Sequence, residues 1–240
     1  MKIAVVPARG GSKRIPRKNI RLFEGKPIIA WSIEAALAAG CFDRVIVSTD
    51  DADIAAVARQ YGAEVPFLRP TELADDYAGT AEVVRHVISA LSVQGGAAVS
   101  AACCIYATAP FIAAQDLCQG FALLTAPSAE PKLQGEQHAQ DYALAVTEFE
   151  FPIQRAVAVD DALQLQMLTP EYAGVRSQDL AKAYHDAGQF CWGTANAWLQ
   201  AKPVYSSATA AVVIPRYRVQ DIDNEEDWHR AELMFRASKL

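Results

Sequence analysis

Residues 2–62, KIAVVPARGGSKRIPRKNIRLFEGKPIIAWSIEAALAAGCFDRVIVSTDDADIAAVARQYG, decide the fold, because strand-like and helix-like segments alternate along them. Lys2–Pro7 and Arg44–Thr49 are short apolar runs typical of buried strands in a parallel sheet. Pro27–Gly40 and Asp51–Tyr61 carry apolar residues at helical spacing and predict two helices. The alternation predicts an α/β fold of three layers, in which helices cover both faces of a mostly parallel sheet.

The alternation continues beyond residue 62 and then changes character. A short strand is predicted over Glu64–Phe67, and a central strand over Ala98–Tyr106, the longest apolar run. Thr80 is expected to cap a helix between them. Residues 126–142 have the composition of a linker. Ala143–Met167 alternates short apolar runs with turns, which predicts an added β-rich arm.

The composition predicts a single globular domain over residues 1–240. Of the 240 residues, 52% are apolar and 21% are charged. Regular structure resumes at Ala211–Ile214, and an amphipathic helix is expected over Glu225–Ser238. No uncharged apolar run reaches the roughly 18 residues that a membrane span needs. The N-terminal apolar run stops at Pro7, too early for a signal peptide.

Charge and cysteine usage exclude further classes. The net charge of −6 argues against a nucleic-acid-binding protein. The five cysteines are an odd number among apolar neighbours, without the spacing of a zinc site, so reduced thiols in a cytoplasmic protein are expected. They are Cys41, Cys103, Cys104, Cys118 and Cys191.

The loop after the first strand is strongly basic, although the whole chain is acidic. Residues 2–26 hold eight cations against the single acid Glu24, which points to a small polyanion, with phosphate as the first candidate. Ligands of open α/β sheets bind beyond the carboxyl ends of the strands, where this loop would lie. Gly10-Gly11 would let backbone N–H groups approach an anion closely. The segment is neither a P-loop nor a GxGxxG fingerprint, and a Gly-Gly turn beside basic residues is also common as a plain surface turn.

A second candidate site is the pair Asp221 and Asp223. Two aspartates at i and i+2 point to one side of an extended segment. Mg²⁺ is commonly held by one or two protein carboxylates together with phosphates and water, so a magnesium site is predicted here, with Mn²⁺ as an alternative. The other interpretation is that Asp223 only N-caps the following helix, with Glu225, Glu226 and Asp227 favouring its positive end.

Residues 7–20, PARGGSKRIPRKNI, resemble the signature loop of the cytidylyltransferases that activate nonulosonic (sialic-acid-like) sugars as CMP-sugars. The resemblance continues in the order of that family through FDRVIVSTDD (42–51), AEVPFLRPTELADD (63–76), ATAPF (107–111) and DIDNEEDW (221–228). Two segments of this chain, EFEFPIQRA (148–156) and RSQDLAKAYHDAGQFCWG (176–193), are more similar to the branch that acts on pseudaminic acid than to ordinary CMP-N-acetylneuraminate synthetases.

This resemblance implies a nucleotide-diphospho-sugar-transferase type of α/β fold. It also implies a homodimer, in which a β-rich arm of approximately residues 141–192 reaches the neighbouring subunit and contributes to the sugar site. Arg155 is the candidate in this arm for reaching the partner's site. The implied reaction transfers CMP from CTP to the anomeric hydroxyl of the sugar, and pyrophosphate leaves.

The family's functional residues are carried over by matching motifs. Arg9, Lys18, Asp221 and Asp223 are implied to be catalytic, the two aspartates as metal ligands. Thr80 would hydrogen-bond the cytosine edge, although a role as helix cap alone is equally open. The residues implied to bind the nucleotide are Ala8, Arg9, Gly10, Gly11, Ser12, Lys13, Lys18, Asn19, Arg69 and Thr80.

The sugar side departs from the sialate enzymes. Tyr106 stands where they commonly have Gln, and Ala187 where they usually have Asn, so the pocket is expected to be less polar and to suit a 7,9-dideoxy sugar. Arg176 would pair with the sugar carboxylate. A general-base role for His185 is the less favoured alternative to lining the pocket. The residues expected at the sugar are Tyr106, Thr108, Arg176, Gln178, Tyr184, His185, Asp186, Gln189 and Phe190.

Two alternatives remain open at this point. One is a cytidylyltransferase for N-acetylneuraminate, legionaminate or Kdo, although Lys18-Asn19 argues against Kdo enzymes, which typically have Gly-Lys-Pro there. The other is a catalytically silent nucleotide-binding or scaffolding subunit. Pyrophosphate release with each sugar and CTP would separate these possibilities.

Overall fold

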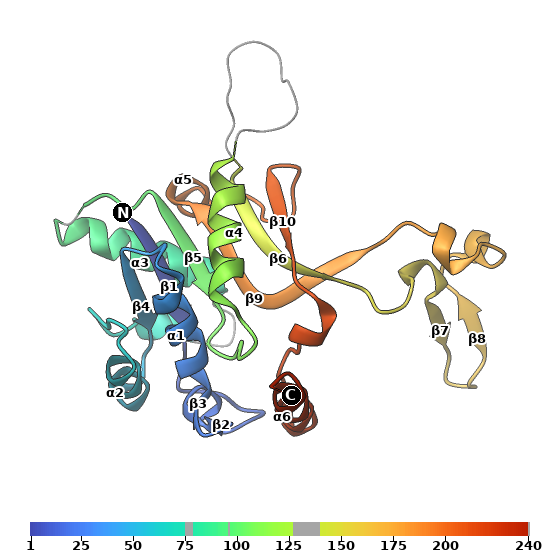
Figure 1. The fold of residues 1–240 in the computed structure, drawn as a ribbon, viewed down its shortest axis with the longest axis horizontal. Helices are drawn as coiled ribbons and strands as arrows, with labels where there is room; N and C mark the ends of the chain where they lie inside the picture. The colour runs from blue at the N-terminus through green and yellow to red at the C-terminus, as the bar shows by residue number, and fades with distance from the viewer. Residues whose placement is uncertain (75–78, 96, 127–139, 240) are drawn as a thin grey trace, which may run out of the picture.

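A six-stranded sheet forms the centre of the computed structural model, which describes residues 1–74, 79–95, 97–126 and 140–239 (Figure 1). Its strands are β1 (Lys2–Pro7), β4 (Arg44–Ser48), β5 (Ala101–Ile105), β6 (Tyr142–Glu148), β9 (Tyr184–Thr194) and β10 (Thr209–Val213). The order across the sheet is β10-β6-β9-β5-β1-β4. Parallel pairs join β1 to β4, β1 to β5 and β10 to β6, whereas β9 is antiparallel to both neighbours. The predicted mostly parallel sheet is confirmed.

Helices cover both faces of this sheet. They are α1 (Ile28–Ala39), α2 (Ala52–Gln60), α3 (Thr80–Val93), α4 (Ala114–Thr125) and α5 (Ala195–Leu199). A further helix, α6 (Glu225–Ala237), packs in a separate small core. Alternate side chains of β1 show how the layers form, since a strand directs successive side chains to opposite faces. Ala4 and Val6 pack in one core with α1, α2 and α4, while Ile3 and Val5 pack in another with α3 and α5. The predicted three-layer arrangement is confirmed.

Two local predictions are wrong. Glu64–Phe67 does not form a strand, because only Glu64 makes a bridge, to Ile46 of β4. Thr80 does not cap α3: Gly79 is the N-cap, and its N–H donates to a Glu82 carboxylate oxygen 3.1 Å away. Thr80 is the first helical residue instead.

A β-rich arm leaves the sheet between β6 and β9, as Figure 1 shows. It contains the hairpin of β7 (Val157–Val159) and β8 (Leu165–Met167). The expected range of 141–192 is too wide, because β6 and β9 pair within the central sheet as far as Glu148 opposite Tyr184. The projecting part therefore comprises residues 149–183.

Three smaller findings complete the fold. A hairpin of β2 (Leu22–Phe23) and β3 (Lys26–Pro27) lies between the basic loop and α1. Most of the linker-like stretch 126–142, residues 127–139, lies outside the described residues. Along the described part of the chain, no helix is long and apolar enough to cross a membrane, and all five cysteines are free thiols.

Candidate active site

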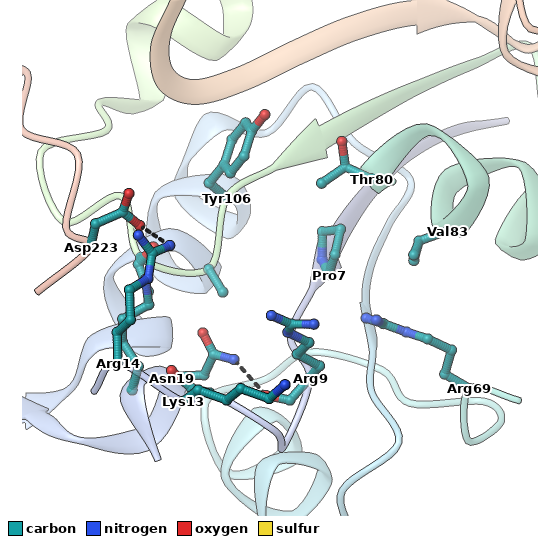
Figure 2. Close-up of a pocket in the computed structure, with 14 residues that line it drawn as sticks. Pro7, Arg9, Lys13, Arg14, Asn19, Arg69, Thr80, Val83, Tyr106 and Asp223 are labelled. Atoms are coloured by element: carbon teal, nitrogen blue, oxygen red, sulfur yellow. Dashed lines mark hydrogen bonds and ion pairs between the residues drawn. The ribbon is translucent and has the colours of Figure 1, made fainter. Parts of the chain in front are cut away.

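The basic loop and the aspartate pair meet at the carboxyl end of β1. The Lys18 Nζ atom donates to the Ile222 carbonyl oxygen at 2.6 Å, across 204 positions of sequence. Arg14 forms an ion pair with Asp223 at 2.7 Å (Figure 2). Both contacts border a cavity of about 500 Å³. The two elements that the sequence singled out therefore form one site.

A small apolar core holds the two elements together. Ile15 from the loop and Ile222 from the aspartate segment are fully buried in the same cluster, with Phe23, Phe111 and Trp228. Since Ile222 points into this core, the aspartates on either side of it face away from the core, as alternation in an extended segment requires. The capping interpretation of Asp223 is wrong, because the Asn224 side chain accepts the N–H bond of Asp227 and caps α6.

Side-chain contacts with the start of α2 fix the loop on its other side. Arg17 has a left-handed backbone, with φ 56°, and forms ion pairs with Asp51 and Asp53, both at 2.7 Å. The Gly10 N–H donates to an Asp50 carboxylate oxygen at 3.0 Å. A phosphate contact from the Gly10 amide would have to replace this bond.

Gly10 lies where a side chain does not fit. An added Cβ would come within 2.6 Å of an Asp51 carboxylate oxygen, whereas a Cβ on Gly11 meets nothing within 4 Å. Gly10→Ala is therefore expected to lower the free energy of unfolding by about 1–3 kcal/mol, the usual range for overpacking. Urea denaturation measures this, with Gly11→Ala as the matched control. Equal stability of the two variants would contradict the role given to the Asp51 contact.

The charges at the site are coupled. Burial lowers the pKa of Lys18, and the nearby carboxylates of Asp223 and Asp221 oppose that shift. Burial and the negative charge of Asp223 raise the pKa of Asp221. Asp221 and Asp223 therefore form a close pair of like charges, and a cation between them would stabilise both ionised carboxylates.

The raised pKa of Asp221 predicts a change of stability with pH. The folded protein disfavours the ionised carboxylate, so its charge lowers the free energy of unfolding above the folded-state pKa. Below the ordinary value of 3.8 the group is neutral in both states and the effect disappears. Asp221→Asn is therefore expected to unfold at higher urea concentration than the unchanged chain at about pH 7, with the gain vanishing below about pH 4. Denaturation in EDTA measures this, and a less stable variant at pH 7 would contradict it.

A buried arginine forms the wall opposite the aspartates. Arg69 is 7% exposed, and its guanidinium donates to the carbonyl oxygens of Ser48 and Leu73 and to the Ser48 hydroxyl. Burial lowers the pKa of Arg69, and the carboxylate of Asp50 opposes that shift. In Figure 2 the guanidinium groups of Arg69 and Arg9 point toward one another. Two cations that face each other favour an anion between them.

Most of the predicted nucleotide residues line the large cavity. Ala8, Gly10 and Gly11 are not among the lining residues, and Ala8 is 1% exposed in the sheet core. The sequence did not single out Arg14, although it belongs to the same basic loop. The lining residues are Pro7, Arg9, Ser12, Lys13, Arg14, Lys18, Asn19, Arg69, Thr80, Val83, Tyr106, Ala107, Thr108 and Asp223.

A second cavity of about 350 Å³ adjoins the first at Tyr106, which lines both. Burial raises the pKa of Tyr106 well above the ordinary value of a phenol. Asp221 also lines the second cavity, while Asp223 lines the first. The remaining lining residues are His185, Asp186, Ala187, Gly188, Val219 and Gln220.

A third cavity of about 340 Å³ lies on the other side of His185 and Asp186. Tyr184 lines it together with both of these residues. The His185 ring packs edge-on against Phe149, 4.7 Å between centroids, and its Nδ1 atom lies 2.8 Å from the Asp186 carbonyl oxygen.

Of the remaining predicted sugar residues, Thr108 lines the first cavity, and the others line neither of the first two cavities. Arg176 and Gln178 belong to the arm, where Arg176 forms an ion pair with Asp179 at 2.7 Å and Gln178 lines a separate cavity. Arg155 donates to the Val175 carbonyl oxygen within the arm. Gln189 is 3% exposed.

The expectation that Phe190 contacts the sugar is wrong, because its side chain is fully buried in the sheet core. Ala187 and Phe190 pack in the same core although they are three residues apart, which strict strand alternation does not allow. Gly188 lies between them with φ 62°, and this left-handed residue shifts the alternation.

Comparison with known proteins agrees with this geometry. The family model for cytidylyltransferases matches residues 3–169, about 70% of the chain. The chain belongs to the cytidylyltransferase family. Its catalytic class as a nucleotidyltransferase is thereby confirmed.

Individual relatives of this cytidylyltransferase include a pseudaminic acid cytidylyltransferase from Campylobacter jejuni, 42% identical over 98% of this chain and 97% of the relative. A CMP-N,N'-diacetyllegionaminic acid synthase from Legionella pneumophila is 54% identical over 89 residues, 37% of each chain. A solved CMP:2-keto-3-deoxy-manno-octonic acid synthetase complexed with CTP has a TM-score of 0.69 and 16% identity, over 100% of this chain and 99% of that one. The last likeness confirms the expected type of α/β fold.

Proposed function

We propose that this cytidylyltransferase transfers CMP from CTP to the anomeric hydroxyl of a nonulosonic acid, with pseudaminic acid as the first candidate, and releases pyrophosphate. The observation that carries the proposal is the meeting of the basic loop with Asp221 and Asp223 beside two adjoining cavities. The 42% identity to a pseudaminic acid cytidylyltransferase over nearly both full lengths supports the choice of sugar.

The larger cavity suits the nucleotide. Arg9, Lys13 and Lys18 would neutralise the triphosphate, and Arg69 would act from the opposite wall. Asn19 is held by a bond from its amide to the Arg9 carbonyl oxygen at 2.9 Å, so it links the nucleotide site to the loop backbone. These groups position CTP and stabilise negative charge that develops as pyrophosphate leaves.

The donor set fits Mg²⁺, with Mn²⁺ as an alternative. Asp221 and Asp223 supply carboxylate oxygens from one segment, and burial together with the negative charge of Asp223 raises the pKa of Asp221, an effect that a bound cation would oppose. No cluster of three acidic, histidine or cysteine side chains stands ready for a metal in the parts of the chain that the structure describes. The carboxylates of Asp221 and Asp223 therefore fit an ion that completes its coordination shell with phosphates and water. Such an ion would polarise the α-phosphate when bound.

The second cavity suits the acceptor sugar. Tyr106 separates it from the nucleotide, and Ala187 and Gly188 offer little polar surface. An aromatic ring and a methyl group in place of two amides suit a sugar that carries methyl and acylamino groups instead of hydroxyls. His185 and Asp186 would line the sugar, and Arg176 and Gln178 would reach it only from the partner's arm.

We also propose a homodimer in the cytoplasm. The arm carries apolar side chains that are largely exposed in the single chain, which is typical of an interface. They include Phe151, Val159, Leu163, Leu165 and Leu168. Analytical ultracentrifugation tests this, and a monomer at micromolar concentration would contradict it.

A pyrophosphate-release assay tests the function. The chain is incubated with CTP, Mg²⁺ and, separately, pseudaminic, N-acetylneuraminic and legionaminic acids and Kdo, and CMP-sugar formation is confirmed by mass spectrometry. The highest kcat/KM is expected with pseudaminic acid. A higher value with legionaminic or N-acetylneuraminic acid would replace the sugar but keep the reaction. Tight CTP binding without turnover of any sugar would overturn the function in favour of a silent nucleotide-binding subunit.

A further inference from the structure

We infer that Asp116, Arg218 and Gln189 form a buried network that positions the aspartate segment for catalysis. None of the three lines a cavity with the substrates, so they act as positioning residues through Asp221 and Asp223. The inference rests on the proposed function, in which those two aspartates hold the metal ion.

The centre of the network is a two-pronged ion pair. Arg218 donates from Nη1 to one Asp116 oxygen at 2.7 Å and from Nη2 to the other at 3.2 Å. The side chains are 18% and 8% exposed, less than in any other ion pair recorded between described residues. Asp116 lies in the first turn of α4, where the helix dipole favours a negative charge. Such a bidentate pair fixes direction as well as distance.

Gln189 ties the pair to the sugar side of the site. Its side-chain amide donates to the Arg218 carbonyl oxygen at 2.6 Å, and its own backbone carbonyl accepts from the Tyr106 N–H at 2.9 Å. Gln189 thus bridges Tyr106 at the end of β5 and the chain that leads to the aspartates. Its buried Oε1 atom has no hydrogen-bond partner among the described residues. A buried amide oxygen without a partner is unfavourable, so the two hydrogen bonds that Gln189 does make hold it in place at a cost in stability.

The network lies directly before the metal-binding segment. Arg218 ends a short 3-10 helix, Arg216–Arg218, and Val219 and Gln220 then line the second cavity on the way to Asp221. On the far side of this segment Ile222 is anchored in the apolar core. The segment is therefore fixed at both ends, by the ion pair of Arg218 with Asp116 and by the packing of Ile222. Residues that orient metal ligands without touching the metal typically change metal affinity or activity about 10–100-fold when replaced.

The test compares Arg218→Met, Arg218→Lys and Asp116→Asn with a matched control, Lys202→Met. Lys202 also forms a part-buried ion pair, with Asp141 at 2.7 Å, but it lies outside both cavities. For each variant the folded fraction is determined by circular dichroism. Mn²⁺ binding in the presence of CTP is measured by electron paramagnetic resonance, and kcat and the KM for CTP are measured with the preferred sugar.

We expect Arg218→Met to weaken Mn²⁺ binding about 10-fold or more and to lower kcat by a similar factor, with a smaller change in the KM for CTP. Arg218→Lys should recover part of both losses because it keeps the charge, and Lys202→Met should leave both within about twofold of the unchanged chain. If Arg218→Met fails to fold, Mn²⁺ binding and kcat of Arg218→Lys and Asp116→Asn test the inference in its place. Unchanged Mn²⁺ binding and kcat per folded molecule would overturn the inference. If the unchanged chain turns over no sugar but the Arg218 variants still lose Mn²⁺ binding in the presence of CTP, the proposed function is overturned. The positioning role of the network is then kept.

Discussion

Asp221→Ala and Asp223→Ala should each lower kcat by about 10³-fold or more at saturating Mg²⁺, while the variants remain folded. Asp223 lines the larger cavity and Asp221 the second, whereas the intervening Ile222 carries the packing, so removal of the aspartates should spare the core. The loss is large because the metal would no longer be held where charge develops on the transferred phosphate. Pyrophosphate release measured over a range of Mg²⁺ concentrations, with circular dichroism, gives both quantities.

Glu226→Gln is the control for this experiment. It removes a carboxylate from the exposed first turn of α6, outside the large cavity, and should leave kcat within about twofold. Near-normal activity of both aspartate variants would refute the metal assignment, because among the described residues the only other carboxylate that lines the two cavities is that of Asp186.

Arg9→Ala should raise the KM for CTP and lower kcat, with a combined loss of about 10²–10³-fold in kcat/KM. Arg9 lines the larger cavity, where its guanidinium faces that of Arg69 (Figure 2), and in the proposed function its charge would face the triphosphate. A contact that strengthens as pyrophosphate leaves should affect kcat as well as binding. Steady-state kinetics with varied CTP at fixed sugar separates the two effects.

Arg21→Met serves as the comparison for Arg9→Ala. Arg21 belongs to the same basic loop region, but it pairs with Glu225 at 2.6 Å and does not line the cavity. The Arg21→Met substitution should change kcat/KM by no more than about threefold, through the summed electrostatic potential of the basic loop. Equal effects of the two substitutions would mean that the loop attracts CTP only through its total charge, and Arg9 would lose its specific role.

The central part of the fold could be predicted from sequence because its signals are local. Lys2–Pro7, Arg44–Thr49 and the helix after Pro27 follow from apolar spacing alone, and the structure has each within one residue of the expected ends. The prediction of a strand over Glu64–Phe67 was wrong, because a short apolar run does not indicate whether a neighbouring strand is free to pair with it along its length. The basic side of the site could also be predicted from sequence, since eight cations within residues 2–26, against one acid, indicate an anionic ligand.

The way in which the site is assembled could not be predicted in the same way. The contact of Lys18 with Ile222 spans 204 positions, and only the shared core of Ile15 and Ile222 shows why the two segments meet. The face on which Phe190 lies depends on the left-handed Gly188, which no periodicity reveals. The ion pair of Arg14 with Asp223 is one of several that the basic loop could make, so its partner is set by the fold and not by spacing.

The arm begins and ends on neighbouring antiparallel strands, with Glu148 opposite Tyr184. Its two roots are thus only one strand spacing apart, roughly 5 Å, a gap that a two-residue reverse turn closes. The whole projection is consequently modular: evolution or an engineer could trim, lengthen or graft it while the catalytic sheet keeps its register. A change in the length of the arm can therefore leave the pairing of β6 with β9 intact.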